Sequence, residues 1–343
     1  MHMANELLSV PVAAGTLVLA GSGLSLVCRK ARQVITTDKL ALMGILGAFV
    51  FAGQMVNFQL PAMPGTSGHM VGAVLLAIIL GPHAAVIVMA SVVIIQCLIF
   101  QDGGLLALGC NIINMAIVPT YLGYFLYKTA AGGQTSRSRI YIGAVLACVI
   151  AVEAGAILVP VQTLLSAVLA VPFSTFLVTM IGVHFLVGII EGLITIAVLA
   201  YLQKVRPDLI INSSVSKAKP STKSVLIIMF ALTIITAGGL SLLASELPDG
   251  LEWSYAERPD QPDFEPIVSN KDSTVVAVDD FQSRYSLLPE YSIRTSGLGN
   301  TPQQQEDVSF GWTSFAGVIG SGLTMFSIWL IAWILRKKRR PAI

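Results

Sequence analysis

LALMGILGAFVFAGQMVNFQLPAMPGTSGHMVGAVLLAIILGPHAAVIVMASVVIIQCLIFQ (residues 40–101) contains no acidic or basic side chain other than His69 and His83. A membrane-spanning helix needs about 20 consecutive apolar residues, so these 62 residues predict about three crossings. The whole chain is 55% hydrophobic and 12% charged, whereas soluble domains are about 25% charged. Because main-chain groups in lipid must be satisfied within helices, we expect an all-α integral membrane protein.

Nine apolar segments are predicted to cross the bilayer as helices: 8–28, 40–60, 67–80, 83–101, 106–127, 140–161, 173–202, 224–245 and 311–335. Most lysines and arginines fall in four short clusters: 29–39, 128–139, 204–223 and 336–340. All four clusters lie on one side of the membrane if the N-terminus is outside, and basic loops are typically cytoplasmic. We therefore predict nine helices, with the N-terminus outside and the C-terminus inside.

A change of composition divides the chain into two units. Residues 204–223 are rich in Ser, Lys and Pro, which is typical of a cytoplasmic linker. They separate a seven-helix unit, 1–203, from a two-helix unit, 224–343. The segment 246–310 between the last two helices holds 13 of the 19 acids and is predicted to lie outside the cell. A field that attracts cations and a soluble spacer both explain it.

The first two residues can chelate a metal ion. The Met1 α-amine, the His2 amide nitrogen and the His2 imidazole Nδ1 form fused five- and six-membered chelate rings that are nearly coplanar. His69 lies at a Gly- and Pro-rich outer turn before a short apolar segment, which is typical of a binding site in a membrane protein. It can supply a fourth nitrogen. Four coplanar nitrogens suit Ni(II), Cu(II) or low-spin Co(II) better than Zn(II) or Mg(II).

Ordinary interpretations of these histidines compete with the metal site. A His at position two is often an accident of coding, and a His at the start of a helix often caps it. No basic segment precedes the first apolar run, so we expect no cleavable signal peptide that would remove His2. On the residues alone, the metal site and the ordinary interpretations both stay open.

Three ionisable residues are predicted to lie within the membrane. His184 and Glu191 are seven residues apart, hence on one face of a helix, and Glu153 lies in the preceding segment. Such groups are costly in lipid and usually face the interior of the bundle. They could surround a metal site, relay protons in a self-sufficient secondary transporter, or form a buried hydrogen-bond set.

Other polar residues have simpler predicted roles. Asp102, followed by Gly103 and Gly104, lies at an outer turn, where it could cap the next helix or orient a ligand imidazole. Asn111 and Asn114 are predicted to hydrogen-bond between helices. His83 faces the cytoplasm and is assigned no role.

Catalytic and nucleotide-binding patterns are missing from the sequence. It contains no GxxxxGK[ST], HExxH or GxSxG pattern and no CxxC spacing among its four cysteines. No basic patch outside the four clusters points to nucleic acid. We therefore expect a transport protein without catalysis of its own, and not an enzyme.

The chain resembles the NikM/CbiM family over about residues 1–203. The likeness rests on MHM at the start, PGTSGHMVGAVLLAIILGP (64–82), FQDGGLLALGCNIINMA (100–116) and GVHFLVGIIEGLIT (182–195). These proteins are substrate-binding (S) components of energy-coupling-factor transporters for nickel and cobalt. The resemblance implies a seven-helix bundle with an inserted N-terminal segment, in the plasma membrane of a prokaryote. It implies Met1, His2 and His69 as metal ligands, and the residues around them would include Ser67, Asp102, His184 and Glu191.

The C-terminal part, from ELPDGLEWS (246–254) onward, resembles the NikN-type two-helix partner, here fused. The resemblance implies cytoplasmic ATPase subunits and a coupling transmembrane (T) subunit as partners. Many relatives begin MHIPDG where this chain reads MHMANE, a difference that removes no ligand but leaves nickel and cobalt both open. The fused outer loop favours nickel. Co(II) and a proton-coupled secondary transporter are the alternatives.

Overall fold

The computed structural model describes residues 1–60, 62–131, 136–170, 172–206, 209–210, 222–255, 272–292 and 302–337. The predicted linker 204–223 lies mostly outside these residues. The predicted acidic segment 246–310 is described only in part, so neither boundary is tested by the structure.

The described chain is almost entirely helical. Its helices are α1 (Val10–Val34), α2 (Thr37–Gln54), α3 (Ala73–Leu80), α4 (Pro82–Ile95), α5 (Leu108–Asn111), α6 (Val118–Ala131), α7 (Arg137–Leu165), α8 (Phe173–Val205), α9 (Thr222–Gly238), α10 (Glu252–Tyr255), α11 (Ser273–Tyr285) and α12 (Pro302–Lys337). Short 3-10 turns cover Asn5–Leu7, Leu240–Leu243 and Pro289–Tyr291, and π-helical turns cover Gln96–Phe100 and Ile112–Ile117. The two strands, β1 (Phe58–Gln59) and β2 (Ser67–Gly68), form one antiparallel pair.

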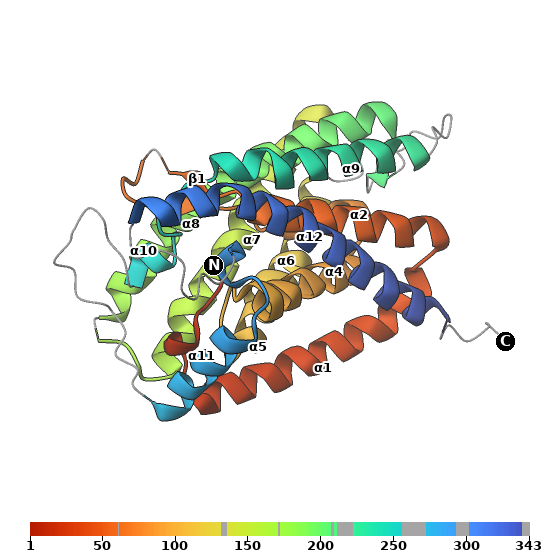
Figure 1. The fold of residues 1–343 in the computed structure, drawn as a ribbon. Helices are drawn as coiled ribbons and strands as arrows, with labels where there is room; N and C mark the ends of the chain where they lie inside the picture. Colours follow the sequence, from red (N-terminus) through yellow and green to blue (C-terminus); the bar gives the residue numbers. More distant parts are fainter. Residues whose placement is uncertain are drawn as a thin grey trace.

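The long helices pack side by side around a buried centre (Figure 1). α7 lies against α8 and α6, whereas α2 packs against α9 and α12 from the C-terminal part of the chain. α3 and α4 form the centre and are almost wholly buried. The N-terminus lies within this arrangement and not at its edge (Figure 1). Because α9 and α12 pack against α2, they belong to the same bundle as α1 to α8.

Seven helical stretches of the described chain are long and apolar enough to cross a membrane: Val10–Val34, Pro82–Phe100, Leu108–Ala131, Arg137–Leu165, Phe173–Val205, Lys223–Leu243 and Trp312–Lys337. The predicted crossings 40–60 and 67–80 do not meet this standard. α2 has 18 residues and includes Asp38, Lys39 and Gln54. The prediction that 67–80 is helical throughout is wrong, because the helix begins only at Ala73. Its eight residues rise about 12 Å, against about 30 Å of hydrocarbon, so nine crossings and their orientation stay predictions.

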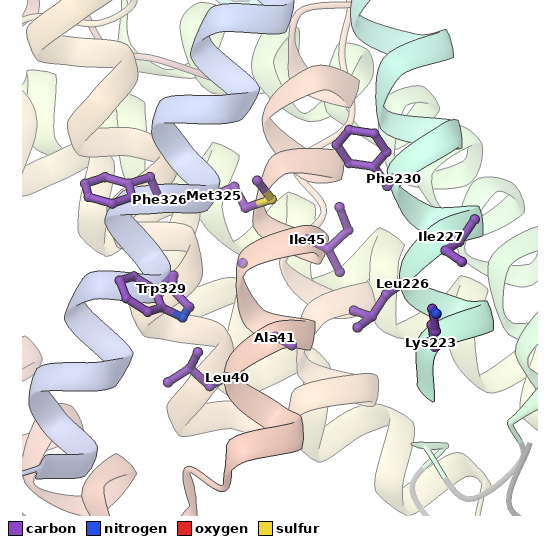
Figure 2. A pocket seen from close by; sticks show the side chains of 11 residues that line it. Leu40, Ala41, Ile45, Lys223, Leu226, Ile227, Phe230, Met325, Phe326 and Trp329 are labelled. Carbon is purple, nitrogen blue, oxygen red and sulfur yellow. The ribbon is translucent and has the colours of Figure 1, made fainter. Parts of the chain in front are cut away.

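An apolar groove of about 560 Å³ lies between α2, α9 and α12 (Figure 2). Ile45, Phe230 and Met325 lie along it, and Lys223 lies at one end (Figure 2). The groove shares no residue with the polar cavity around His2 and His69 described below. It is therefore part of the apolar packing surface of these helices and not a candidate metal site.

Candidate metal site

The N-terminal segment lies inside the bundle. Met1 is 3% exposed and Met3 is fully buried. Asn111 holds the main chain of Met3 at both ends, because its Oδ1 accepts from Met3 N at 2.8 Å and its Nδ2 donates to Met3 O at 3.2 Å. Gly104 N also donates to Met3 O at 2.8 Å. Asn111 thus fixes the segment that carries His2, whereas Asn114 pairs with Gln162 of α7 as the interhelical prediction states.

The His2 imidazole contacts two acceptors. Its Nε2 lies 3.1 Å from Gln96 Oε1, and its Nδ1 lies 3.0 Å from Asp102 Oδ1. Tyr291 donates its hydroxyl proton to Asp102 Oδ2 at 2.5 Å. Burial lowers the pKa of His2, which precedes the first spanning helix, to about 4, and the Asp102 carboxylate only partly offsets this. The imidazole is therefore neutral at physiological pH and retains one nitrogen lone pair.

His69 follows β2, which pairs with β1 and ends the turn between the two strands. Its Nδ1 lies 3.1 Å from Met70 O. Since a carbonyl only accepts, Nδ1 carries the proton, and in the neutral ring the lone pair then lies on Nε2. The His69 and His2 rings are stacked, with centroids 5.4 Å apart and planes 24° apart. The structure thus places the two histidines that the sequence analysis selected side by side.

A carboxylate that the sequence analysis did not select lies between these groups. Asp249 Oδ2 is 3.1 Å from the Met1 amine and 3.7 Å from His69 Nε2. Burial alone would raise the pKa of Asp249, but the Met1 ammonium beside the carboxylate outweighs burial and holds that pKa well below its usual range. The sequence does contain a signal for its local role, since Asp249 and Glu252 have the spacing of a helix capping box.

Ser67 joins the site to the segment that carries Asp249. Its hydroxyl donates to Leu247 O at 2.8 Å, and its main-chain N–H donates to Pro248 O at 2.9 Å. The hydroxyl of Thr66 also lies 3.3 Å from Pro248 O. The residues just before α10, which come from the C-terminal part of the chain, therefore form one wall of the site.

Glu191 reaches the site through the main chain. Its carboxylate accepts from Val71 N at 2.7 Å and from Gly72 N at 3.1 Å. These two residues lie in the non-helical stretch between β2 and α3. Non-helical backbone within a membrane protein is tolerated only where other groups satisfy it. Glu191 therefore permits the extended chain that presents His69.

His184 lies close to the same groups. It helps to line a small cavity of about 10 Å³ together with Met1, His69 and Asp249. Its Nδ1 lies 2.9 Å from Met180 O, one turn earlier in α8, so Nε2 is the nitrogen with a free lone pair. The cavity has room for about one water molecule or ion.

Two other ionisable residues lie elsewhere. His83 pairs with Tyr121, its Nδ1 lying 2.7 Å from the hydroxyl. Both carboxylate oxygens of Glu153 are buried without a hydrogen-bond partner in the described part of the chain. Neither side chain lies with His2 and His69.

A larger cavity of about 670 Å³ opens beside the two histidines. Six acidic residues of the described chain line it: Asp102, Glu246, Asp249, Glu252, Asp279 and Glu290. No lysine or arginine is among its described lining residues. Asp279 and Glu290 come from α11 and from the turn that follows it. We refer to this cavity as the acidic vestibule.

Two known families match parts of this chain. The family described as "Cobalt uptake substrate-specific transmembrane region" matches residues 2–209. The family described as "PDGLE domain" matches residues 223–337. The letters PDGLE are the one-letter codes of residues 248–252 of this chain, which include Asp249.

Several proteins named as metal transport proteins are similar to this chain in sequence. A protein of Archaeoglobus fulgidus that carries the name fused nickel transport protein NikMN is 38% identical over 174 residues, which are 50% of this chain and 55% of that protein. The match thus spans about half of that relative. A protein of Lactiplantibacillus plantarum named as a fused nickel transport protein, LarMN, is 29% identical over 75% of this chain and 79% of its own length. A cobalt transport protein CbiM of Acetoanaerobium sticklandii is 36% identical over 32% of this chain and 44% of its own.

A solved structure has the same fold over much of the chain. It is described as the crystal structure of a transition metal transporter, and it aligns with a TM-score of 0.54 at 29% sequence identity. The alignment covers 60% of this chain and 93% of that one.

Proposed function

The chain belongs to the family of cobalt-uptake substrate-specific transmembrane proteins, and from this premise we propose that it captures Ni(II) from outside the cell for an ATP-driven energy-coupling-factor transporter. It is a multi-pass membrane transport component for transition-metal ions and not an enzyme. The identity of the ion, the coordination and the coupling to ATP are the proposed parts.

The proposed ligands are four nitrogen atoms: the Met1 amine, the His2 amide, His2 Nδ1 and His69 Nε2. One observation carries this set. The Met1 amine and His69 Nε2 face the same oxygen, Asp249 Oδ2, at 3.1 and 3.7 Å. Nitrogens from both ends of the proposed set therefore converge on one region, and the stacked His2 ring lies beside it.

The protonation of the two rings suits this set. Met70 O keeps the proton of His69 on Nδ1, which leaves Nε2 for the metal. Gln96 Oε1 can accept from His2 Nε2–H, which leaves His2 Nδ1 with its lone pair beside Asp102. A lone pair 3.0 Å from a carboxylate oxygen is repulsive unless a cation lies nearby. Asp102, for which the sequence left a helix cap and the orientation of a ligand imidazole both open, is therefore well placed to stabilise a bound dication.

The acidic vestibule supports cation capture. A cavity lined by charges of one sign raises the local concentration of counter-ions and their association rate. The six vestibule acids belong to both predicted units of the chain. We thus favour cation recruitment over a passive spacer for the described part of the acidic segment.

We propose the same two units that the sequence predicts, 1–203 and 224–343 joined by the linker 204–223, acting as one metal-binding body. Cytoplasmic ATPase subunits and a coupling transmembrane subunit are the proposed partners, on the strength of the family resemblance. A proton-coupled secondary transporter is less favoured, because Glu191 is committed to main-chain N–H groups and His184 to Met180 O. Nickel or cobalt uptake by this chain alone in liposomes, driven by a pH gradient without ATP, would reverse that preference.

Direct binding measurements on the purified chain with its native N-terminus test the proposed cargo. Ni(II) should bind tightly and give the ligand-field absorption of a square-planar complex, and Co(II) should compete with it. Zn(II) and Mg(II) should compete poorly, because a planar set of four nitrogens suits neither ion. Equal affinity for Zn(II) and Ni(II), or an octahedral Ni(II) spectrum, would refute the proposed coordination.

A further inference from the structure

Asp249 has two separate tasks, one for each carboxylate oxygen. Its Oδ1 accepts from Leu251 N at 2.7 Å and from Glu252 N at 2.9 Å, which caps the start of α10. Its Oδ2 faces away from that cap, toward the Met1 amine and His69 Nε2. Helix capping therefore accounts for the position of Oδ1 only, and Oδ2 faces the proposed metal site.

The position of Asp249 is set by contacts on both sides. Ser67 holds Leu247 O and Pro248 O on one side. On the other side, a Cβ atom at Gly250 would lie 2.1 Å from Val183 of α8, so only glycine lets the segment approach this closely. The segment 247–250 is thus seated between β2 and α8. The carboxylate of Asp249 therefore has a fixed position.

We propose that Asp249 is a positioning residue that completes the metal site from the C-terminal unit, holding the Met1 amine beside His69 and facing the captured dication with a negative charge. This inference rests on the proposed function. An amine that coordinates a metal keeps N–H groups, so Met1 can still donate to Asp249 Oδ2 after the ion binds. Asp249 then acts through Met1 without binding the ion itself. High affinity therefore requires both units of the chain.

The chain offers variants that separate charge from capping. Asp249→Asn retains an oxygen that can cap α10, since Asn is as good an N-cap as Asp, but it removes the negative charge. Asp280→Asn removes one negative charge at an exposed position of α11 that does not line the acidic vestibule. The two variants change net charge equally. Only the first removes the carboxylate that faces Met1.

The experiment measures Ni(II) affinity and the ligand-field spectrum of bound Ni(II) for the full chain and these variants. For Asp249→Asn we expect binding weaker by about 10- to 100-fold, the range for groups that orient metal ligands, with an unchanged spectrum. Asp280→Asn should bind within about threefold of the native chain, a limit chosen well below that range. An unchanged affinity in Asp249→Asn would reduce Asp249 to a helix cap, and a shifted spectrum would make it a direct ligand. Either result overturns the inference.

The proposed function is checked independently in the same series. His69→Ala removes a proposed ligand and leaves Asp249 in place. If His69→Ala binds Ni(II) as the native chain does, the proposed ligand set fails whatever Asp249→Asn shows. If His69→Ala loses binding and Asp249→Asn does not, the ligand set stands and only the role of Asp249 is refuted. Thermal unfolding of each variant in detergent identifies any variant that fails to fold. If Asp249→Asn is such a variant, Asp249→Glu, which retains the charge, takes its place in the affinity measurement.

Discussion

The carboxylate of Glu191 in α8 accepts a hydrogen bond from the main-chain N–H of Val71 at 2.7 Å, although 120 residues separate them. Gly72 N donates to the other oxygen at 3.1 Å. This pair of hydrogen bonds lets the chain run without helical bonds between β2 and α3. His69 is presented by that stretch, so Glu191 supports the site without contacting it.

Removing this support should weaken both the fold and metal binding. Glu191→Ala leaves two buried N–H groups unsatisfied, each costing about 1–3 kcal/mol. We expect a lower unfolding temperature and a lower Ni(II) affinity, whereas Glu191→Gln, which keeps an acceptor oxygen, should lose less of each. Glu153→Ala in neighbouring α7 is the control, because that carboxylate has no hydrogen-bond partner in the described chain. Equal losses in the two alanine variants would contradict the role given to Glu191.

His69→Ala should lower Ni(II) affinity by at least about 100-fold, because it removes a direct ligand and even groups that only orient ligands are worth about 10- to 100-fold. His83→Ala should leave affinity unchanged, since His83 pairs with Tyr121 away from the site. Isothermal titration of both purified variants measures this. Similar losses in the two would refute the assignment of His69.

Ni(II) affinity should rise between pH 6 and pH 8. Coordination by the Met1 amine and the His2 amide releases protons, and each released proton makes binding up to about tenfold tighter per pH unit. The His2 imidazole contributes no slope in this range, because its pKa of about 4 keeps it neutral throughout. Competition titrations at fixed ionic strength measure the dependence. A dissociation constant that does not change with pH would exclude amide ligation.

Neutralising the acidic vestibule should slow metal capture. Glu246→Gln with Glu290→Gln removes two of its charges, and we expect association several-fold slower at low salt, with the difference disappearing at high salt through screening. Stopped-flow capture of Ni(II) at two ionic strengths measures this. A difference that persists at high salt would indicate altered structure and not a lost field.

Deleting the whole acidic segment would not measure the electrostatic effect of its acidic residues alone. Tyr291 donates to Asp102, and Gln282 of α11 donates to Gly103 O at 2.8 Å and accepts from Leu105 N at 2.9 Å. A deletion would therefore also release the loop that carries Asp102. Substitutions that change only charge avoid this problem.

The sequence predicted what depends on local composition. The charge-free stretch 40–101 indicated a membrane protein, and the motifs around His2 and His69 indicated the family, which the comparisons confirm. Asp249 and Gln96 escaped notice because contacts across 248 and 94 residues bring them to the N-terminus. The extended stretch before α3 is as apolar as a helix, and only its partner Glu191, far along the chain, distinguishes it.

The first two residues are proposed to chelate the ion, and the metal content of the purified protein tests this proposal. The native chain is purified beside a version with one alanine inserted between Met1 and His2, which breaks the fused chelate rings and keeps every original side chain. We predict about one Ni(II) per native chain and almost none in the insertion variant, while both unfold at similar temperatures without metal. Equal metal content in the two proteins would contradict the N-terminal chelate.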